Sequence, residues 1–383
     1  MLILALMLVF VFILLIITYM LCIIHTEWKP VYVSDVPHYL SSLGFEPIKT
    51  EEIAYCASGI DVFNSLISDI RNAKQSITLS FYTIKPCTYS KQLEDELRHA
   101  KMRGVKLNVI LDAMGSYNFI SNSKLGNIVK YNPFGLTNKY FVYRDHDKYV
   151  MIDDSILYLA SFVIRESSIS TWIESGIRVV GDFKSRNIDE EFTASLKREC
   201  FITPDMFIPF WCSGKQHMGL YADVYLNCIN NAKSKIYIIT PYFVPPDEII
   251  DALVRKTNEG CDVNILCLSK SDHPIIGVAS EALAGDMLQR TNKRINFYRY
   301  PHTHVHSKIM LVDDDIVIFG SGNFDYRSLF QMHETGAYVK NKYLYNEIYT
   351  QLMELLSKSN RVKVRKNILK LKLLSSQMLR SLL

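Results

Sequence analysis

One short pattern, a histidine and a lysine two residues apart with an aspartate five residues after the lysine, occurs twice in this chain of 383 residues. The two copies consist of His146, Lys148 and Asp153, and of His306, Lys308 and Asp313. The histidines lie 160 residues apart (306 − 146), and each is followed by a glutamate 28 residues later, Glu174 and Glu334. A single copy could arise by chance. Two copies with matched acids indicate a duplicated half-site, and therefore a fold of two similar lobes.

The residue types of the pattern suit chemistry on a phosphodiester. Residues i and i+2 of a β-strand lie on one face, so the histidine and lysine of each copy point the same way. An imidazole can act as nucleophile or general acid near neutral pH. The ammonium beside it can hold a phosphoryl oxygen while negative charge builds there. Two facing halves would supply one histidine to attack phosphorus and another to protonate the leaving oxygen, with no metal or other cofactor.

Four further residues are expected to support the histidines. Glu174 and Glu334 could each hold a ring nitrogen and so fix the tautomer of a histidine. Residues 320–323 read Gly-Ser-Gly-Asn, which places Ser321 and the Asn323 amide among the groups that assist phosphate binding.

The aspartates of the pattern are weaker candidates for direct catalysis. Asp153 and Asp313 each follow a run of apolar strand residues. That position favours a role in bracing the fold or orienting a lysine over contact with substrate.

The duplicated pattern resembles the phospholipase D superfamily, and the resemblance covers nearly everything after the N-terminal segment. Four flanking stretches look like the bacterial-type cardiolipin synthases: residues 112–116, 172–174, 240–245 and 320–328. The resemblance implies a phosphatidyltransferase that acts on a phospholipid such as phosphatidylglycerol through a phosphohistidine intermediate. It also implies that His146 is the nucleophile and that His306 protonates the leaving alcohol.

The first copy departs from the pattern of the second. Ala160 stands where the second copy has glycine, and Val163 stands where it has Asn323. Valine cannot donate a hydrogen bond. Losing one donor to a charged phosphate costs about 1.5–3 kcal/mol, or roughly one to two decades of rate. A slowed or altered site is therefore expected, not an abolished one.

Other functions stay open on the sequence alone. If water resolves the intermediate, the same site is a phospholipase D. A nuclease needs a basic, aromatic-lined groove, and the net charge of +4 argues against a nucleic-acid partner. A membrane-remodelling protein with a partly decayed site is the non-enzymatic alternative. Finally, His302, His304 and His306 alternate as in a zinc site, although Lys308 would share their face.

Residues 2–24 form an unbroken run of 23 residues without a charge. As a helix the run would be roughly 34 Å long, enough for a hydrocarbon core of about 30 Å. No basic residue precedes it and no small-residue cleavage site ends it, so a retained anchor at residues 1–29 is favoured over a signal peptide. The eight cysteines lack paired spacing and no glycosylation sequon occurs, which favours a catalytic part that faces the cytosol.

Strands and helices are expected to alternate in the same order in both halves. The expected helices are residues 61–74, 91–103, 221–233, 247–259 and 276–289. The expected strands are residues 76–82, 106–111, 235–240, 262–268 and 295–298. This alternation predicts two α/β lobes, each with a mostly parallel sheet flanked by helices.

The expected lobes are flanked by other segments. The predicted order is the anchor, a linker at 30–50, a first lobe at 51–213, a second lobe at 214–357 and a basic tail at 358–383. The tail could form an amphipathic helix on an anionic membrane surface or pack on the second lobe. The sequence does not indicate an oligomeric state.

Overall fold

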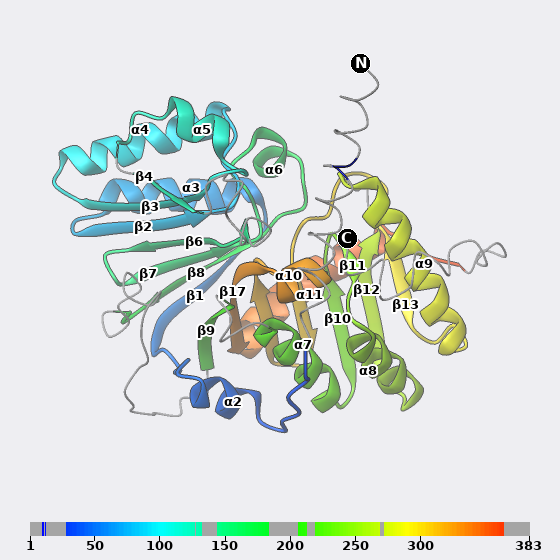
Figure 1. Ribbon diagram of the computed structural model, residues 1–383. Coiled ribbons are helices and arrows are strands. Elements are labelled where there is room, and N and C mark those ends of the chain that lie inside the picture. The colour runs from blue at the N-terminus through cyan, green and yellow to red at the C-terminus, as the bar shows by residue number, and fades with distance from the viewer. Residues whose placement is uncertain are drawn as a thin grey trace, which may run out of the picture.

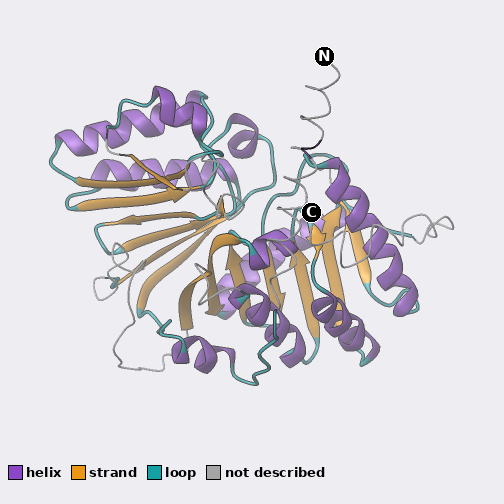
Figure 2. Cartoon of the chain, in the orientation of Figure 1, coloured by secondary structure: helices purple, strands orange, loops and turns teal. Residues whose placement is uncertain are grey.

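A computed structural model describes residues 10, 12, 28–126, 128–131, 144–183, 206–212, 219–268 and 272–363 of the chain. These residues form two lobes, each built on one large β-sheet (Figure 1; Figure 2). The described helices are α2 (Val36–Ser42), α3 (Gly59–Asn72), α4 (Thr88–Met102), α5 (Tyr117–Asn122), α6 (Glu166–Ser170), α7 (Leu220–Asn231), α8 (Asp247–Asn258), α9 (Pro274–Arg290), α10 (Tyr326–Phe330) and α11 (Lys342–Ser357).

The first sheet contains the first copy of the repeat. Its strands are β1 (Thr50–Cys56), β2 (Ser76–Phe81), β3 (Lys106–Asp112), β4 (Ile128–Tyr131), β6 (Lys148–Ile152), β7 (Ile156–Ala160) and β8 (Gly176–Gly181). They are ordered β1-β8-β7-β6-β2-β3-β4. The strand that carries Lys148 therefore lies in the middle of the sheet.

The second sheet contains the second copy. Its strands are β5 (Arg144–Asp145), β9 (Met206–Cys212), β10 (Lys235–Ile239), β12 (Asp262–Leu268), β13 (Asn296–Arg299), β14 (Ile309–Val312), β15 (Ile316–Gly320), β17 (Met332–Lys340) and β18 (Asn360–Arg361). They are ordered β18-β13-β12-β10-β14-β15-β17-β5, and β9 also pairs with β17. A separate two-stranded pair joins β11 (Phe243–Val244) to β16 (Phe324–Asp325).

The sheets are mixed, so the prediction of mostly parallel sheets was wrong. Parallel pairing joins β2, β3 and β4 in one lobe, and β10, β12 and β13 in the other, with β5 also parallel to β17. The other neighbours are antiparallel, because the strands of the repeat fold back as the hairpins β6–β7 and β14–β15. Asp153, Asp154 and Asp313 in their turns have positive φ, a conformation that hairpin turns favour.

Alternate residues of the central strands face two different cores. In β6, Tyr149 and Met151 pack between the lobes, whereas Val150 and Ile152 pack under α3 and α4. The core between the lobes also contains one face of α11, and α7 and α8 cover the outer face of the second sheet. The two sheets are therefore buried against each other, which fixes the relative position of the two half-sites.

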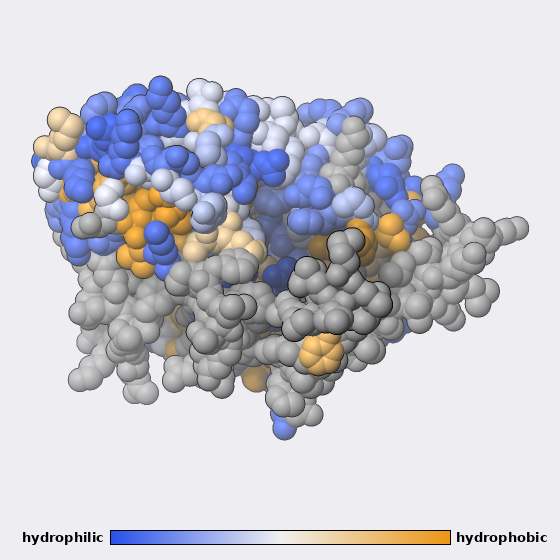
Figure 3. Space-filling model, turned by 45° about the horizontal axis from the view of Figure 1, so that its top comes forward, coloured by the Kyte–Doolittle hydropathy of each residue, from blue (hydrophilic) through white to orange (hydrophobic). Residues whose placement is uncertain are grey.

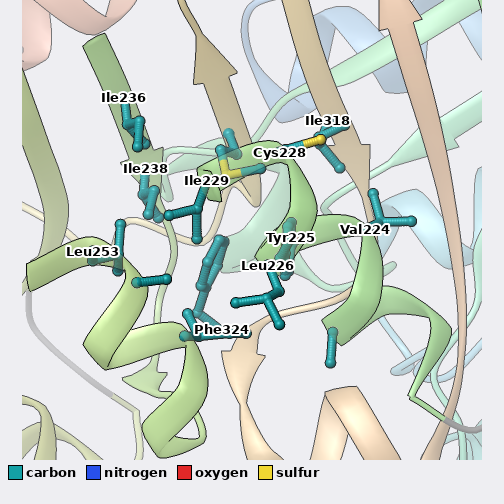
Figure 4. Close-up of a cluster of buried hydrophobic side chains, with 14 of the residues drawn as sticks. Val224, Tyr225, Leu226, Cys228, Ile229, Ile236, Ile238, Leu253, Ile318 and Phe324 are labelled. Atoms are coloured by element: carbon teal, nitrogen blue, oxygen red, sulfur yellow. The ribbon is translucent and has the colours of Figure 1, made fainter. Parts of the chain in front are cut away.

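The outer core of the second lobe holds the loop that follows β15. Figure 4 shows side chains of α7 lying against Ile236 and Ile238 of β10. In this cluster the Tyr225 ring stacks on Phe324 at 3.9 Å, and the Tyr225 hydroxyl donates to the Gly322 carbonyl at 3.0 Å. The core thus fixes the backbone between Ser321 and Asn323.

The predicted helices and strands occur in the predicted order, most of them within about three residues of the expected bounds. One detail was wrong: α3 starts at Gly59, and its N-cap is Ser58, whose side chain accepts from the Asp61 backbone N–H. Asp61, where the helix was expected to start, therefore lies inside it. Ser58 has the extended backbone of an N-cap residue.

The stretch predicted as a linker is folded against the second lobe. It contains α2, capped by Asp35 with a proline in the first turn. The Asp223 carboxylate of α7 accepts hydrogen bonds from Trp28 Nε1 and from the Val31 backbone N–H, both at 3.1 Å. Asn227, also on α7, exchanges hydrogen bonds with the backbone of residues 31 and 33. Residues 28–42 are therefore part of the second lobe, not a spacer.

The predicted lobe boundary and tail also differ from the structure. β9 pairs with β17 along its whole length, so the second sheet begins before residue 214. The first residues of the predicted tail form the edge strand β18 next to β13, where a helix was expected. Residues 364–383 lie outside the described part of the chain.

The apolar run of the predicted anchor, residues 2–24, lies outside the described residues except for Phe10 and Phe12. Among the residues that the structure describes, none of the helices has the length and apolar character needed to cross a bilayer.

Candidate active site

The two copies of the repeat meet where the lobes join. His146 precedes β6 and His306 precedes β14, and each is hydrogen-bonded to the other lobe. The His146 backbone N–H donates to the His333 carbonyl at 2.9 Å, and that of His306 donates to the Ile173 carbonyl at 2.8 Å. The matched contacts relate the half-sites by a pseudo-two-fold axis. Figure 3 shows hydrophilic residues in the hollow between the lobes.

Each histidine is oriented by the glutamate of the other lobe. His146 Nδ1 lies 2.8 Å from Glu334 Oε1, and His306 Nδ1 lies 2.7 Å from Glu174 Oε1. If Nδ1 carries the ring proton and donates it to the carboxylate, Nε2 keeps a lone pair for chemistry. The sequence predicted that the glutamates hold ring nitrogens. It did not reveal the crossed pairing, because the spacing is the same in both halves.

Serine hydroxyls hold the glutamates in turn. Ser321 Oγ donates to Glu334 Oε2 at 2.5 Å, and Ser161 Oγ donates to Glu174 Oε2 at 2.6 Å. Ser321 and Ser161 therefore each hold in place the carboxylate that orients a histidine.

The two lysines are buried beside the histidines, each with 1% of its surface exposed. Lys148 Nζ lies 3.0 Å from His146 Nε2, and Lys308 Nζ donates to the His306 carbonyl. Burial lowers the pKa of Lys148 to about 8 and that of Lys308 to about 7, although the two glutamates partly offset it. The charge of Lys148 also lowers the pKa of Lys308, so the two buried cations favour the binding of an anion such as a phosphate.

The two His–Glu pairs differ in charge. Burial lowers the pKa of His146 well below its usual value, and Lys148 and Lys308 add to the effect. Burial lowers the pKa of His306 to about 4, against the opposing charge of Glu174. Burial raises the pKa of Glu334 to about 7. Burial acts on Glu174 too, but the charges of His306 and Lys308 outweigh it, so the pKa of Glu174 lies below its usual value.

Asn323 lies in the loop after β15 with 4% of its surface exposed. Among the described residues, its Oδ1 has no hydrogen-bond partner. Val163, at the matching place in the first lobe, is also buried, with 7% of its surface exposed. One half of the site thus has an amide where the other has an apolar side chain.

Packing requires glycine at Gly320, the counterpart of Ala160. A Cβ at Gly320 would lie 2.3 Å from the Thr335 carbonyl oxygen and 2.4 Å from the Tyr221 hydroxyl, so only glycine fits there. Val62 is the counterpart of Tyr221 in the first lobe, because Val62 lies at Gly176 of β8 and Tyr221 lies at the matching Gly336 of β17. Valine is the smaller of the two side chains. The Ala160 position therefore differs from Gly320 in the helix side chain beside it.

Asp153 and Asp313 lie at the ends of β6 and β14 that are remote from the histidines. Asp153 accepts from the backbone N–H groups of residues 74–76, and Asp313 accepts from those of residues 233–235. These contacts tie each hairpin to the start of a neighbouring strand. The geometry fits the bracing role.

Several polar pairs around the site were not predicted. Arg144, which lies two residues before His146, donates from Nη2 to Asp112 Oδ1 at 2.6 Å. Asp112 opens one of the flanking stretches noted in the sequence, so this signal was available. Two further contacts join the lobes directly: Thr335 Oγ1 to Asp147 Oδ1, and Ser175 Oγ to Ser307 Oγ. Nothing in the sequence pattern pointed to these two pairs.

The alternating histidines are not arranged as a metal site. The exposed His302 ring lies against Tyr300, with centroids 5.2 Å apart, whereas His304 packs beside His306, with centroids 5.4 Å apart. Within the described ranges, no three His, Cys, Asp or Glu side chains are placed to hold a metal ion.

Solved structures share this fold. The crystal structure of phosphatidylserine synthase from Haemophilus influenzae Rd KW20 matches with a TM-score of 0.67 at 13% identity, over 86% of this chain and 92% of that one. Polyphosphate kinase from Porphyromonas gingivalis matches with a TM-score of 0.57 at 12% identity, over 89% of this chain and 54% of that one.

Sequence relatives and a family model agree on the branch. A cardiolipin synthase of Listeria welshimeri is 27% identical over 339 residues, which cover 80% of this chain and 69% of the relative. The minor cardiolipin synthase ClsB of Bacillus subtilis is 26% identical over 340 residues, covering 82% of this chain and 84% of the relative. The family model described as cardiolipin synthase, PLD-like domain, matches residues 66–196 and 225–358. These two stretches contain both copies of the repeat and most of the chain, which therefore belongs to the cardiolipin synthase family of phospholipase D-like domains.

Proposed function

We propose that this protein is a membrane-anchored phosphatidyltransferase of the cardiolipin synthase type, which joins two phospholipids such as phosphatidylglycerol. The observation that carries the proposal is the pair of buried His–Lys sets, each completed by a glutamate of the opposite lobe. The relatives named as cardiolipin synthases support a lipid as the substrate.

The first step forms a phosphohistidine. His146 Nε2 attacks the phosphorus of the donor lipid, and the P–O bond to its head-group alcohol breaks. His306, in its protonated form, gives the Nε2 proton to the leaving oxygen. The negative phosphodiester itself favours that protonated form, and Lys148 and Lys308 balance the charge that develops on the phosphoryl oxygens.

The second step transfers the phosphatidyl group. A hydroxyl of the acceptor lipid gives its proton to His306 Nε2 while its oxygen attacks phosphorus. The P–N bond to His146 breaks, so His146 returns to its neutral form and His306 is again protonated. If water attacks instead, the same cycle hydrolyses the lipid.

The charges around the rings support this division of roles. Ionised Glu174 opposes the lowering of the His306 pKa by burial and by the two lysines, and so favours the protonated form that a proton carrier needs. His146 faces Lys148 and Lys308, which favour its neutral, nucleophilic form. The nucleophile assignment therefore agrees with the one that the family resemblance implies.

Residues 2–24 would anchor the protein, with the catalytic part on the cytosolic side. The cysteines of the described residues are free thiols, and most of them are buried. Free thiols support a reducing compartment.

The reaction is tested with purified full-length protein and phosphatidylglycerol in micelles. We expect cardiolipin and glycerol in equal amounts, and loss of nearly all turnover in His146→Ala and His306→Ala. His302→Ala, a change at an exposed histidine of the same loop, is the control and should keep its activity. Phosphatidic acid as the sole lipid product would show a hydrolase instead.

A donor with an activated leaving group, phosphatidyl-p-nitrophenol, distinguishes the nucleophile role from the proton-donor role of the two histidines. Nitrophenolate leaves without a proton, so His306→Ala should still release about one equivalent in a burst and retain the lipid on His146. His146→Ala should give no burst. The opposite pattern would reverse the two roles.

A further inference from the structure

The two half-sites differ in the residue that stands two positions before each catalytic histidine. In the first half this is Arg144, whose guanidinium is paired with buried Asp112. In the second half it is His304, whose Nε2 lies 3.5 Å from Asp272 Oδ1. The second half therefore has a neutral ring and a nearby carboxylate at the place where the first half has a closed ion pair.

The Asp272 carboxylate is accessible and ionised. Its side chain is 34% exposed, whereas the His304 side chain is 3% exposed. The Tyr242 hydroxyl donates to Asp272 Oδ1 at 2.5 Å. Burial acts against ionisation, but this hydrogen bond and the neighbouring histidines hold the pKa of Asp272 below its usual value. Because only one oxygen receives the tyrosine proton, the carboxylate can accept further hydrogen bonds from a ligand.

The same cluster is continuous with the reacting groups. The Trp172 ring of the first lobe contacts His304 at 4.6 Å and His306 at 5.3 Å between centroids. The Arg165 guanidinium lies 4.6 Å from the centre of the Trp172 ring. No carboxylate of the described residues pairs with Arg165. The Arg165 cation of one lobe thus lies on Trp172, and the Asp272 carboxylate of the other lies beside His304, and both of these rings contact His306.

We propose that Asp272, His304 and Tyr242 form a subsite for the polyhydroxyl head group of the acceptor, with Arg165 placed for the acceptor's own phosphodiester. The subsite rests on the proposed function, in which the alcohol both leaves and arrives beside His306. When one hydroxyl of a glycerol group delivers its proton to His306, a second hydroxyl of the same group can donate to Asp272. Water and simple alcohols have no second hydroxyl for this contact.

The inference is tested by competition between two acceptors in one reaction. Full-length protein is given fluorescent phosphatidylglycerol in micelles, with radiolabelled glycerol and radiolabelled propan-1-ol at equal concentration. The products, labelled phosphatidylglycerol and phosphatidylpropanol, both arise from one phosphatidyl-enzyme. At early times, before labelled phosphatidylglycerol re-enters the reaction, their ratio depends only on acceptor selection, and it is unaffected by how much of a variant is folded.

Wild-type protein should favour glycerol. Asp272→Asn should lower the glycerol-to-propanol ratio by about tenfold or more, the value of one hydrogen bond to a charged group. Tyr242→Phe, which removes only the hydroxyl, should lower it less. His302→Ala is the matched control, because this exposed histidine packs on Tyr300 outside the cluster, and its ratio should equal that of the wild type.

The outcomes separate this subsite from the proposed function. If the wild type transfers to neither alcohol and forms no cardiolipin, the proposed function is wrong. If the wild type transfers to both and Asp272→Asn leaves the ratio unchanged, the cluster has only a packing role and the subsite is wrong.

Discussion

Lys148 and Lys308 are unusual among lysines because burial brings their pKa values to about 8 and about 7. A lysine attracts phosphate only while it is protonated, and an exposed lysine keeps its proton to about pH 10. Since kcat/KM reports the ionisation of the free enzyme, we expect it to fall as the pH rises above about 7 to 8.

Initial rates on micelles of fixed composition would measure this profile. The fall in kcat should begin at higher pH, because the bound phosphodiester stabilises the charged lysines. A kcat/KM that stays constant to about pH 9.5 would contradict the role of the lysines in phosphate binding.

Residue types were the most predictable part of the site. Imidazole, ammonium and carboxylate in a repeated spacing have few chemical uses, so His146, Lys148 and their counterparts could be proposed as site residues before the fold was known. The pairing of each glutamate with a histidine could not be predicted, because it depends on how the lobes pack. The reason for glycine at Gly320 could not be predicted either, since the Thr335 carbonyl oxygen and the Tyr221 hydroxyl that exclude a side chain there come from other elements.

Asp313 connects the elements of the second lobe, and its replacement tests the bracing role. Its carboxylate accepts from the backbone N–H groups of residues 233–235 at the start of β10. Asp313→Asn should lower the stability by about 1–3 kcal/mol at neutral pH, because backbone donors lose a charged acceptor. Thermal melting measures the loss, and kcat of the folded fraction should change little.

The pH dependence of this loss has a defined sign. Burial is outweighed by hydrogen bonds from residues 233–235, so the pKa of Asp313 lies below its usual value. The stabilisation is therefore complete at neutral pH and disappears as the pH falls through that lowered pKa. Asp314→Asn, at the exposed neighbour, is the control and should melt close to the wild type. A loss of kcat without a loss of stability in Asp313→Asn would indicate a catalytic role.

Elements defined by local pattern were predictable, and those defined by turns were not. The amphipathic spacing of α3, α4 and α8 is visible in the sequence. The direction of the strands depends on the turns after Ile152 and Val312, where aspartates adopt positive φ. The prolines near α2 suggested a linker, although Asp35 followed by a proline is also a helix-start signal.

For the whole molecule, the docking of residues 28–33 on α7 determines how the anchor can be tested. If residues 2–24 span the membrane, the intact protein should stay in the membrane fraction after an alkaline carbonate wash. Deleting residues 1–26 should release it without lowering its melting temperature. Deleting residues 1–33 should also release it but lower the melting temperature by several degrees, because Asp223 and Asn227 lose hydrogen-bond partners.

Fractionation and melting curves separate the two parts of this prediction. Release of the intact protein by carbonate alone would contradict the anchor. Equal melting temperatures for the two truncated proteins would contradict the docking of the segment.

The crossing of the glutamates bears on the ancestry of the chain. Neither half encodes a complete histidine site, since the carboxylate for each ring comes from the opposite half. A precursor with a single lobe would have found that carboxylate only in a second copy, as in a two-fold symmetric homodimer. Fusion of two such genes would make the association independent of concentration. It would also let matching positions of the two halves diverge. The contact of Asp147 with Thr335 corresponds to the contact of Ser307 with Ser175, and the residue types of the two contacts differ.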